Sequence, residues 1–193
     1  GATGVSAIGY LPWKTLGLPP LRDGYGNCLW YAVSGSFKAN PKADLLNWDS
    51  TGQFRIVGDD GSTVIAGQSA ATRPLAVIFS PGPPGAGQQR SSNGGNCGRD
   101  YEPAHFLDAF AALDNATLDS NAEGITTLAA SGPTGFNDRL LWISAADLFA
   151  RGAQKRKDFA SNLFDPAYAT TGTPALAQRL AECIAEFGKK NNP

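Results

Sequence analysis

The stretch Asp23–Val33, which reads D-G-Y-G-N-C-L-W-Y-A-V, decides how the first part of this chain folds. Its opening residues predict a tight turn, because Gly24 and Gly26 tolerate positive φ. Asp23 and Asn27 favour the same turn, since their side chains can hydrogen-bond nearby backbone. The last five residues are aromatic and aliphatic, as in a strand with at least one buried face. We therefore predict structural rather than catalytic roles for the four turn residues.

The cysteines provide the next constraint. Cys28 follows the turn, Cys97 lies in the loop sequence S-S-N-G-G-N-C-G, and Cys183 lies in a predicted helix. Two loop cysteines in a chain with few charges favour an oxidising compartment and a Cys28–Cys97 disulfide. Such a bridge would tie down the long loop 80–98 and stabilise the fold by about 4 kcal/mol in the chain-entropy model. The alternative is three reduced cysteines in a cytosolic protein.

Length and charge limit the function classes. The 193 residues are enough for one domain with a sizeable core, or a domain with an appendage. A net charge of −1 argues against electrostatic recruitment of nucleic acid or anionic membrane. The sequence contains no methionine and no run approaching the roughly 20 apolar residues of a membrane span, so we expect a processed or excised part of a longer protein. Residues 1–8 are expected to be disordered, 9–164 globular, and 165–193 a linker with a C-terminal helix.

Alternating and continuous apolar runs predict several more strands. Gln53–Val57 and Ser62–Ala66 flank an Asp-Gly turn and predict a β-hairpin. Leu75–Ser80 is a continuous apolar run, typical of a central strand buried on both faces. Phe136–Ser144 predicts a further strand.

Helical spacing appears in three places. Glu102–Leu113 carries apolar residues at helical spacing, Ser144 can cap a helix over Ala145–Gly152, and Thr173–Gly188 has an apolar stripe.

Residues 10–20, Y-L-P-W-K-T-L-G-L-P-P, contain three prolines and predict an extended strap lying across a hydrophobic surface.

The candidates for a chemical site are weak. Cys97 could act as a nucleophile with His105, the only histidine, oriented by Asp100 or Asp108. A disulfide explains Cys97 better, however. One histidine and no Cys-x-x-Cys spacing argue against a metal site. We predict no catalytic residues, no cofactor and no metal.

Two motifs resemble the type IV pilin-like proteins, which include minor pilins and the pseudopilins of type II secretion. The first is L-P-W-x-T-L-G-L over residues 11–18, followed by D-G-Y-G-N-x-L-x-Y-A-V over Asp23–Val33. Tyr25 stands where tryptophan is usual in the family. The second is N-D-R-L-L-W-I over residues 137–143, followed by Asp147-Leu148-Phe149, which is similar to the later part of large, disulfide-containing members.

The resemblance implies an α+β fold, in which a pilin-like antiparallel sheet packs against a helix, with a long disulfide-tied loop and a C-terminal helix. It implies a structural subunit of a pilus or secretion machine in the periplasm or at the cell surface. Its partners would be other pilin or pseudopilin subunits, with membrane contact only through an N-terminal helix that this sequence does not contain. The alternatives are a secreted carbohydrate- or DNA-binding adhesion module using exposed tryptophans, and a cysteine-dependent hydrolase.

Overall fold

The structure is a computed structural model that describes residues 2–38, 50–90 and 97–148. The chain divides into two compact units, Gly1–Ala145 and Ala146–Pro193. Within the described segments, no helix is both long enough and apolar enough to cross a membrane.

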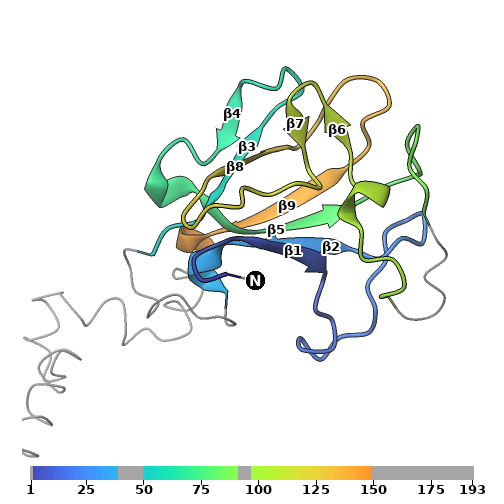
Figure 1. The fold of residues 1–193 in the computed structure, drawn as a ribbon, viewed down its shortest axis with the longest axis horizontal. Coiled ribbons are helices and arrows are strands. Elements are labelled where there is room, and N and C mark those ends of the chain that lie inside the picture. Colours follow the sequence, from blue (N-terminus) through green and yellow to red (C-terminus); the bar gives the residue numbers. More distant parts are fainter. Residues whose placement is uncertain (1, 39–49, 91–96, 149–193) are drawn as a thin grey trace, which may run out of the picture. The chain divides into compact units, whose positions relative to one another are not determined.

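The larger sheet is antiparallel and has four strands in the order β1-β2-β5-β9 (Figure 1). The strands are β1 (Ala7–Tyr10), β2 (Trp30–Val33), β5 (Pro74–Ser80) and β9 (Arg139–Ser144). The predictions of β2 and of β5 as a central strand are confirmed, since β5 pairs with β2 on one side and β9 on the other. The strand β1 takes in Ala7 and Ile8, which the sequence placed in a disordered segment.

A smaller sheet has three strands in the order β4-β3-β8. The strands are β3 (Phe54–Val57), β4 (Val64–Ala66) and β8 (Thr126–Ala129). Antiparallel pairing of β3 with β4 confirms the predicted hairpin, and β8 pairs with β3 in parallel. The strands β6 (Ala109–Phe110) and β7 (Leu113–Asp114) form a separate two-stranded antiparallel ribbon.

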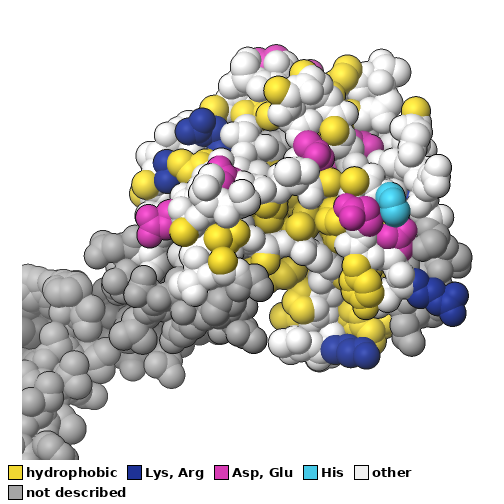
Figure 2. Space-filling model, in the orientation of Figure 1, with side chains coloured by type: hydrophobic (Ala, Val, Ile, Leu, Met, Phe, Trp, Pro, Cys, Tyr) yellow, Lys and Arg dark blue, Asp and Glu magenta, His cyan; other side chains and the backbone are white. Residues whose placement is uncertain are grey.

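The predicted strap over residues 10–20 begins with the last residue of β1 and continues as a projecting loop; we use the name strap below for residues 11–22 (Figure 1). It is the first part of the connection between β1 and β2, and the turn Asp23–Asn27 follows it. Leu11 is buried at its base, but Leu16 and Leu18 are exposed, so the strap covers the core only where it begins. Figure 2 shows hydrophobic side chains at this projection, with Lys or Arg side chains at its margin.

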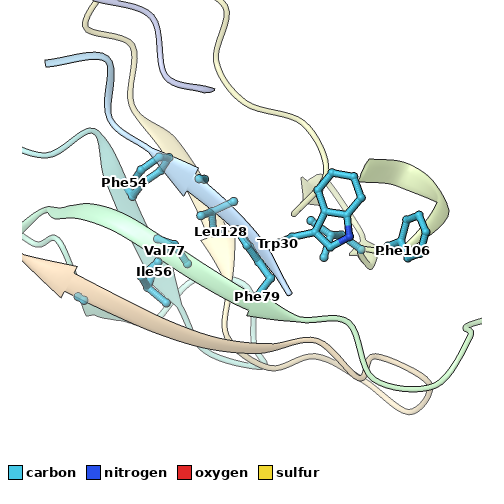
Figure 3. Close-up of a cluster of buried hydrophobic side chains, with 10 residues drawn as sticks. Trp30, Phe54, Ile56, Val77, Phe79, Phe106 and Leu128 are labelled. Carbon is cyan, nitrogen blue, oxygen red and sulfur yellow. The ribbon is translucent and has the colours of Figure 1, made fainter. Parts of the chain in front are cut away.

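The core lies between the two larger sheets and receives residues from both (Figure 3). Large side chains fill it, because each sheet turns an apolar face inward and the pleat places alternate residues on that face. Its largest buried members are Trp30, Phe54, Ile56, Val77, Phe79, Phe106 and Leu128. Tyr10 packs on Trp30 with ring centroids 4.3 Å apart, and Phe106 lies 5.3 Å from Trp30. Phe106 thus packs the segment that follows Cys97 onto the sheets.

The predicted α+β fold, with a pilin-like sheet packed on a helix, is wrong for the described residues. They form strands in several sheets, and their helices are short. It comprises the 3₁₀ helices η1 (Gly35–Phe37), η2 (Ala70–Thr72) and η3 (Pro103–His105), and an α-helical start at 145–148. The end of the helix predicted over 145–152, and all of the helix predicted over 173–188, lie outside the described residues.

The helix predicted over Glu102–Leu113 is also wrong. Only η3 forms, and the chain then enters the β6–β7 ribbon. Ala111 takes a φ of +52°, which reverses the chain and cannot occur inside a right-handed helix. The side chain of Asp108 accepts hydrogen bonds from Asn137 and Asp138, so distant contacts override the local helical spacing.

Candidate functional site

The turn Asp23–Asn27 organises one end of the larger sheet. The Asp23 carboxylate accepts hydrogen bonds from the backbone N–H of Tyr25 at 2.9 Å and of Asn27 at 2.8 Å. Gly26 takes a φ of +82°, whereas Gly24 does not take a positive φ. Asp23 therefore acts as the hydrogen-bond acceptor that shapes the turn.

The same two polar side chains reach the loop after β5. The second Asp23 oxygen accepts from the Gly82 N–H at 2.9 Å, and Asn27 Nδ2 donates to the Gly82 carbonyl at 2.8 Å. A Cβ at Gly82 would lie 2.5 Å from Asn137 Oδ1, so only glycine fits here without a shift. We call Asp23, Asn27, Gly82 and the disulfide Cys28–Cys97 the loop clamp.

The disulfide of the loop clamp confirms the predicted pairing. Cys28 and Cys97 are joined across 69 residues with their Cα atoms 5.8 Å apart, within the range of ordinary disulfides. Cys28 is fully buried. Such a bridge is typical of proteins in oxidising compartments. Because the Cys97 sulfur is bonded, it is not available as the thiolate nucleophile that the sequence allowed.

Arg90 holds the loop beneath the clamp. Its guanidinium donates to the carbonyls of Pro81, Gly82, Pro83, His105 and Phe106 and to Gln88 Oε1. Burial lowers the pKa of Arg90, while the carboxylates of Asp108, Asp138 and Asp23 act in the opposite direction. The sequence analysis missed Arg90, whose only local signal was a lone cation in a Gly- and Pro-rich loop.

Two buried carboxyl groups, Asp108 and Asp138, hold each other's backbone. Asp138 Oδ2 accepts from the Asp108 N–H and from Asn115 Nδ2, both at 2.9 Å. Asp108 Oδ2 accepts from the Asp138 N–H at 3.1 Å. Desolvation and the nearby Asp108 charge raise the pKa of Asp138 to about 7. Among the described residues the buried Asp138 Oδ1 atom has no hydrogen-bond partner, so the protonated form suits this site.

A pocket of about 440 Å³ opens beside Asp108. Its apolar walls include Leu107, Phe110 and Phe136, and the last two rings meet edge to face at 5.4 Å. Asp108 Oδ1 already accepts from Gln88 Nε2 at 2.9 Å, and its Oδ2 is bonded to backbone. Both oxygens of the carboxylate therefore hold loops in place.

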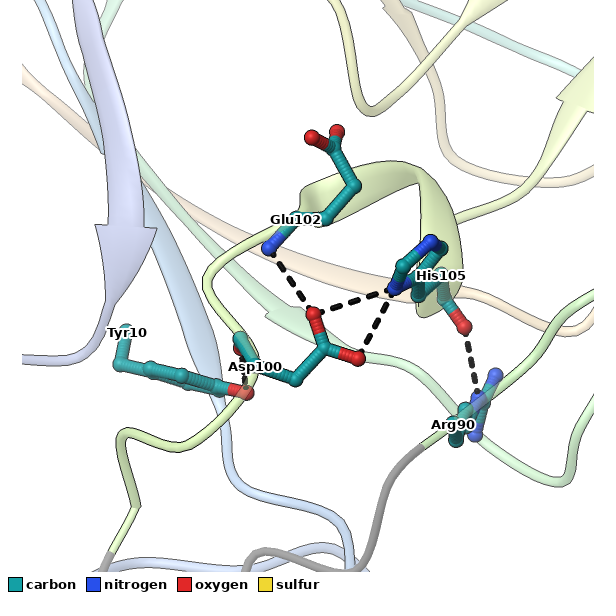
Figure 4. Close-up of polar contacts among 5 residues, drawn as sticks. All are labelled: Tyr10, Arg90, Asp100, Glu102 and His105. Carbon is teal, nitrogen blue, oxygen red and sulfur yellow. Dashed lines mark hydrogen bonds and ion pairs between the residues drawn. The ribbon is translucent and has the colours of Figure 1, made fainter.

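His105 pairs with Asp100, not with a nucleophile (Figure 4). His105 Nδ1 lies 2.9 Å from Asp100 Oδ2 and 3.1 Å from Oδ1, and the same carboxylate accepts from the Glu102 N–H. The Tyr10 hydroxyl donates to the Asp100 carbonyl. This group fastens the segment after Cys97 onto β1, which is a structural task.

The larger sheet also has a second apolar face, which we call the outer face. The core-facing rows are Tyr10, Trp30, Phe79 and Leu140, with Ile8, Ala32, Val77 and Trp142. Because side chains alternate along a strand, the other rows lie on the outer face. These rows are Gly9, Tyr31, Ile78 and Leu141, with Ala7, Val33, Ala76 and Ile143, and the polar pair Ser80 and Arg139 at one end, where Arg139 is exposed.

Burial is uneven across the outer face. Val33 and Ala76 are buried, Tyr31 and Ile78 are partly buried, and Leu141 is 64% exposed. Burial raises the pKa of Tyr31, in keeping with an apolar setting. An apolar face of this kind, open towards one edge strand, is suited to contact with another protein surface.

The tryptophans bear on the alternative of a ligand-binding module. Trp30 is fully buried and cannot touch a ligand, Trp13 is partly exposed, and Trp48 lies outside the described residues.

No group of three or more His, Cys, Asp or Glu that could hold a metal occurs in the described part of the chain. Searches of protein-family models, curated proteins and solved structures found no match to this chain.

Proposed function

We propose that this chain is a structural subunit of an extracytoplasmic assembly, a minor pilin or pseudopilin of a type IV pilus or type II secretion machine. It acts through contacts between proteins in the periplasm or at the cell surface. The observation that carries the proposal is the outer face of the larger sheet, which carries apolar residues on all four strands and exposes Leu141 beside Arg139.

The polar groups of the described chain support this role. The carboxylates of Asp23, Asp100 and Asp108 each accept backbone hydrogen bonds, and the Arg90 guanidinium donates hydrogen bonds to backbone carbonyls. These side chains thus hold loops in place. A rigid body with a locked loop and an apolar face is what a subunit needs if it is to pack repeatedly in one geometry.

The resemblance of the motifs at residues 11–18 and Asp23–Val33 to pilin-like proteins supports a pilin-like subunit as the kind of assembly protein. The Asp23 turn of that motif forms the loop clamp, so its residues have a physical reason to occur together. The disulfide supports export, because such bridges form and persist outside the cytosol.

The test is genetic complementation in the organism that carries the gene. We expect deletion to remove surface fibres or type II secretion, and wild type to restore them. Leu141→Asp should fail to restore them, whereas Ile65→Asp, at an exposed apolar position on β4, should succeed. A deletion that affects neither process, or full rescue by Leu141→Asp, would overturn the proposal.

A further inference from the structure

The strap, residues 11–22, is a structured projection with a fixed base. Leu11 is buried, and its N–H donates to the Leu29 carbonyl at 2.9 Å. The Leu29 N–H in turn donates to the Leu21 carbonyl at 3.2 Å. The tip is closed by its own backbone bonds, including Leu18 N–H to the Trp13 carbonyl at 2.9 Å. Its side chains are thus presented in a defined arrangement.

The tip of the strap exposes large apolar side chains. Leu16 is 54% exposed and Leu18 is 42% exposed, and Leu21 and the partly exposed Trp13 lie on the same short loop. Figure 2 shows hydrophobic side chains gathered at this projection. Several neighbouring apolar side chains exposed together mark a contact surface, whereas single ones are ordinary.

The charges of the strap are of one sign. Lys14 and Arg22 are exposed cations, and residues 11–22 contain no Asp or Glu. The Lys14 ammonium lies 5.2 Å from the Trp13 ring centroid. The next acid, Asp23, faces inward onto Gly82. Leucines and a tryptophan beside cations match the interface of a phospholipid bilayer, where apolar groups enter and cations meet anionic headgroups.

We propose that the strap is a membrane-contacting loop, in which Leu16 and Leu18 enter the headgroup boundary of a phospholipid bilayer and Lys14 meets anionic lipid. A bilayer is favoured over a protein partner because the apolar side chains lie on a projecting tip (Figure 2) and the two charged residues within the strap, Lys14 and Arg22, are both cationic. The net charge of −1 argues against recruitment by the field of the whole protein, so this contact would depend on the apolar tip and on Lys14, whose attraction to headgroups acts within about a Debye length. This inference goes beyond the proposed function and does not depend on it.

The hairpin β3–β4 provides a matched control. Ile65 on β4 is 44% exposed, a fraction similar to that of Leu18. The turn beside Ile65 carries the exposed acids Asp59 and Asp60. Ile65→Ser therefore removes a similar apolar group from a site that anionic lipid should avoid.

The experiment is flotation of the full 193-residue chain with vesicles of phosphatidylcholine containing 30 mol% phosphatidylglycerol, and with pure phosphatidylcholine vesicles. We expect wild type to float with the mixed vesicles and more weakly with the neutral ones. The double variant Leu16→Ser/Leu18→Ser should bind at least about tenfold more weakly. Lys14→Ala should weaken binding to the anionic vesicles about fivefold, and Ile65→Ser should bind as wild type.

Three results would overturn the inference. One is no binding by wild type, and another is equal binding by the double leucine variant. The third is self-association of wild type in lipid-free sedimentation velocity that the double variant loses, since the strap would then serve a second copy of the chain. Circular dichroism checks that each variant is folded, as expected for exposed positions.

Discussion

The two faces of the larger sheet are built from similar residues but differ in what covers them. The inner face places Trp30, Val77 and Phe79 against the smaller sheet, where they are fully buried. The outer face carries Tyr31, Ile78 and Leu141 in the neighbouring register, and none of these is fully buried. The continuous apolar run of β5 therefore serves two purposes. One face stabilises the fold, and we propose that the other binds a partner.

The largest effect should come from emptying the inner face. Phe79→Ala should lower the free energy of unfolding by about 3–5 kcal/mol, because the cavity would lie where two sheets enclose it. The adjacent substitution Ile78→Ala, on the outer face, should cost about 1 kcal/mol, since that side chain is only partly buried. Urea unfolding measures both. Equal losses would mean that the faces do not differ as described.

The loop clamp should come next. Cys28→Ala/Cys97→Ala should lower the free energy of unfolding by about 2–4 kcal/mol, because it frees a segment of 69 residues in the unfolded chain. Urea unfolding of the variant is compared with that of the wild-type protein, both with its disulfide intact and after reduction. If the oxidised and reduced proteins unfold at the same urea concentration, then the apolar faces alone hold this end of the sheet.

Asp138 should make stability depend on pH. Its folded pKa of about 7 lies above the unfolded value near 4, so the folded state binds the extra proton between these values. The free energy of unfolding should therefore be larger at pH 5 than at pH 7, by about 2 kcal/mol from this group. Asp138→Asn should remove that part of the slope and keep an acceptor for Asn115.

Asp60 offers a control of opposite sign for the pH experiment. Hydrogen bonds from Thr63 and Ser62 lower its pKa, so its contribution is present above pH 4 and is lost as the pH falls. Asp60→Asn should therefore leave the slope between pH 5 and pH 7 unchanged. A slope that survives in Asp138→Asn would contradict the assignment to Asp138.

The smallest effect on stability should come from the open edge of the outer face. Leu141→Ser should change the free energy of unfolding by less than about 0.5 kcal/mol, since the side chain is mostly exposed. A loss above about 2 kcal/mol in urea unfolding would mean that Leu141 belongs to the core of the isolated protein.

Sequence reasoning found the strands that carry local signals. Residues 30–33 and 75–80 are runs of β-forming side chains, and the Asp-Gly turn fixed the hairpin. It missed β8, whose Thr126–Ala129 lies in a polar stretch and pairs with β3 about seventy residues away. It also placed a helix over Glu102–Leu113, where the apolar spacing was right but the Asp108 side chain accepts hydrogen bonds from Asn137 and Asp138, just before β9.

The site divides in the same way. The Cys28–Cys97 bridge followed from composition and from the loop positions of the cysteines. The bond from Asp23 to Gly82 crosses 59 residues, and no local pattern encodes it. Asp138 is still harder to find, because its raised pKa comes from burial among Asp108 and Asn115, which only the folded chain brings together.

We propose that the outer face contacts a protein partner in the assembled state. Photo-crosslinking from p-benzoylphenylalanine placed at Leu141, in cells that carry the assembly, would detect this contact. We expect adducts with other pilin or pseudopilin subunits from position 141, identified by mass spectrometry, and none from the same probe at Ile65. No adduct from position 141, or the same adducts from both positions, would contradict it.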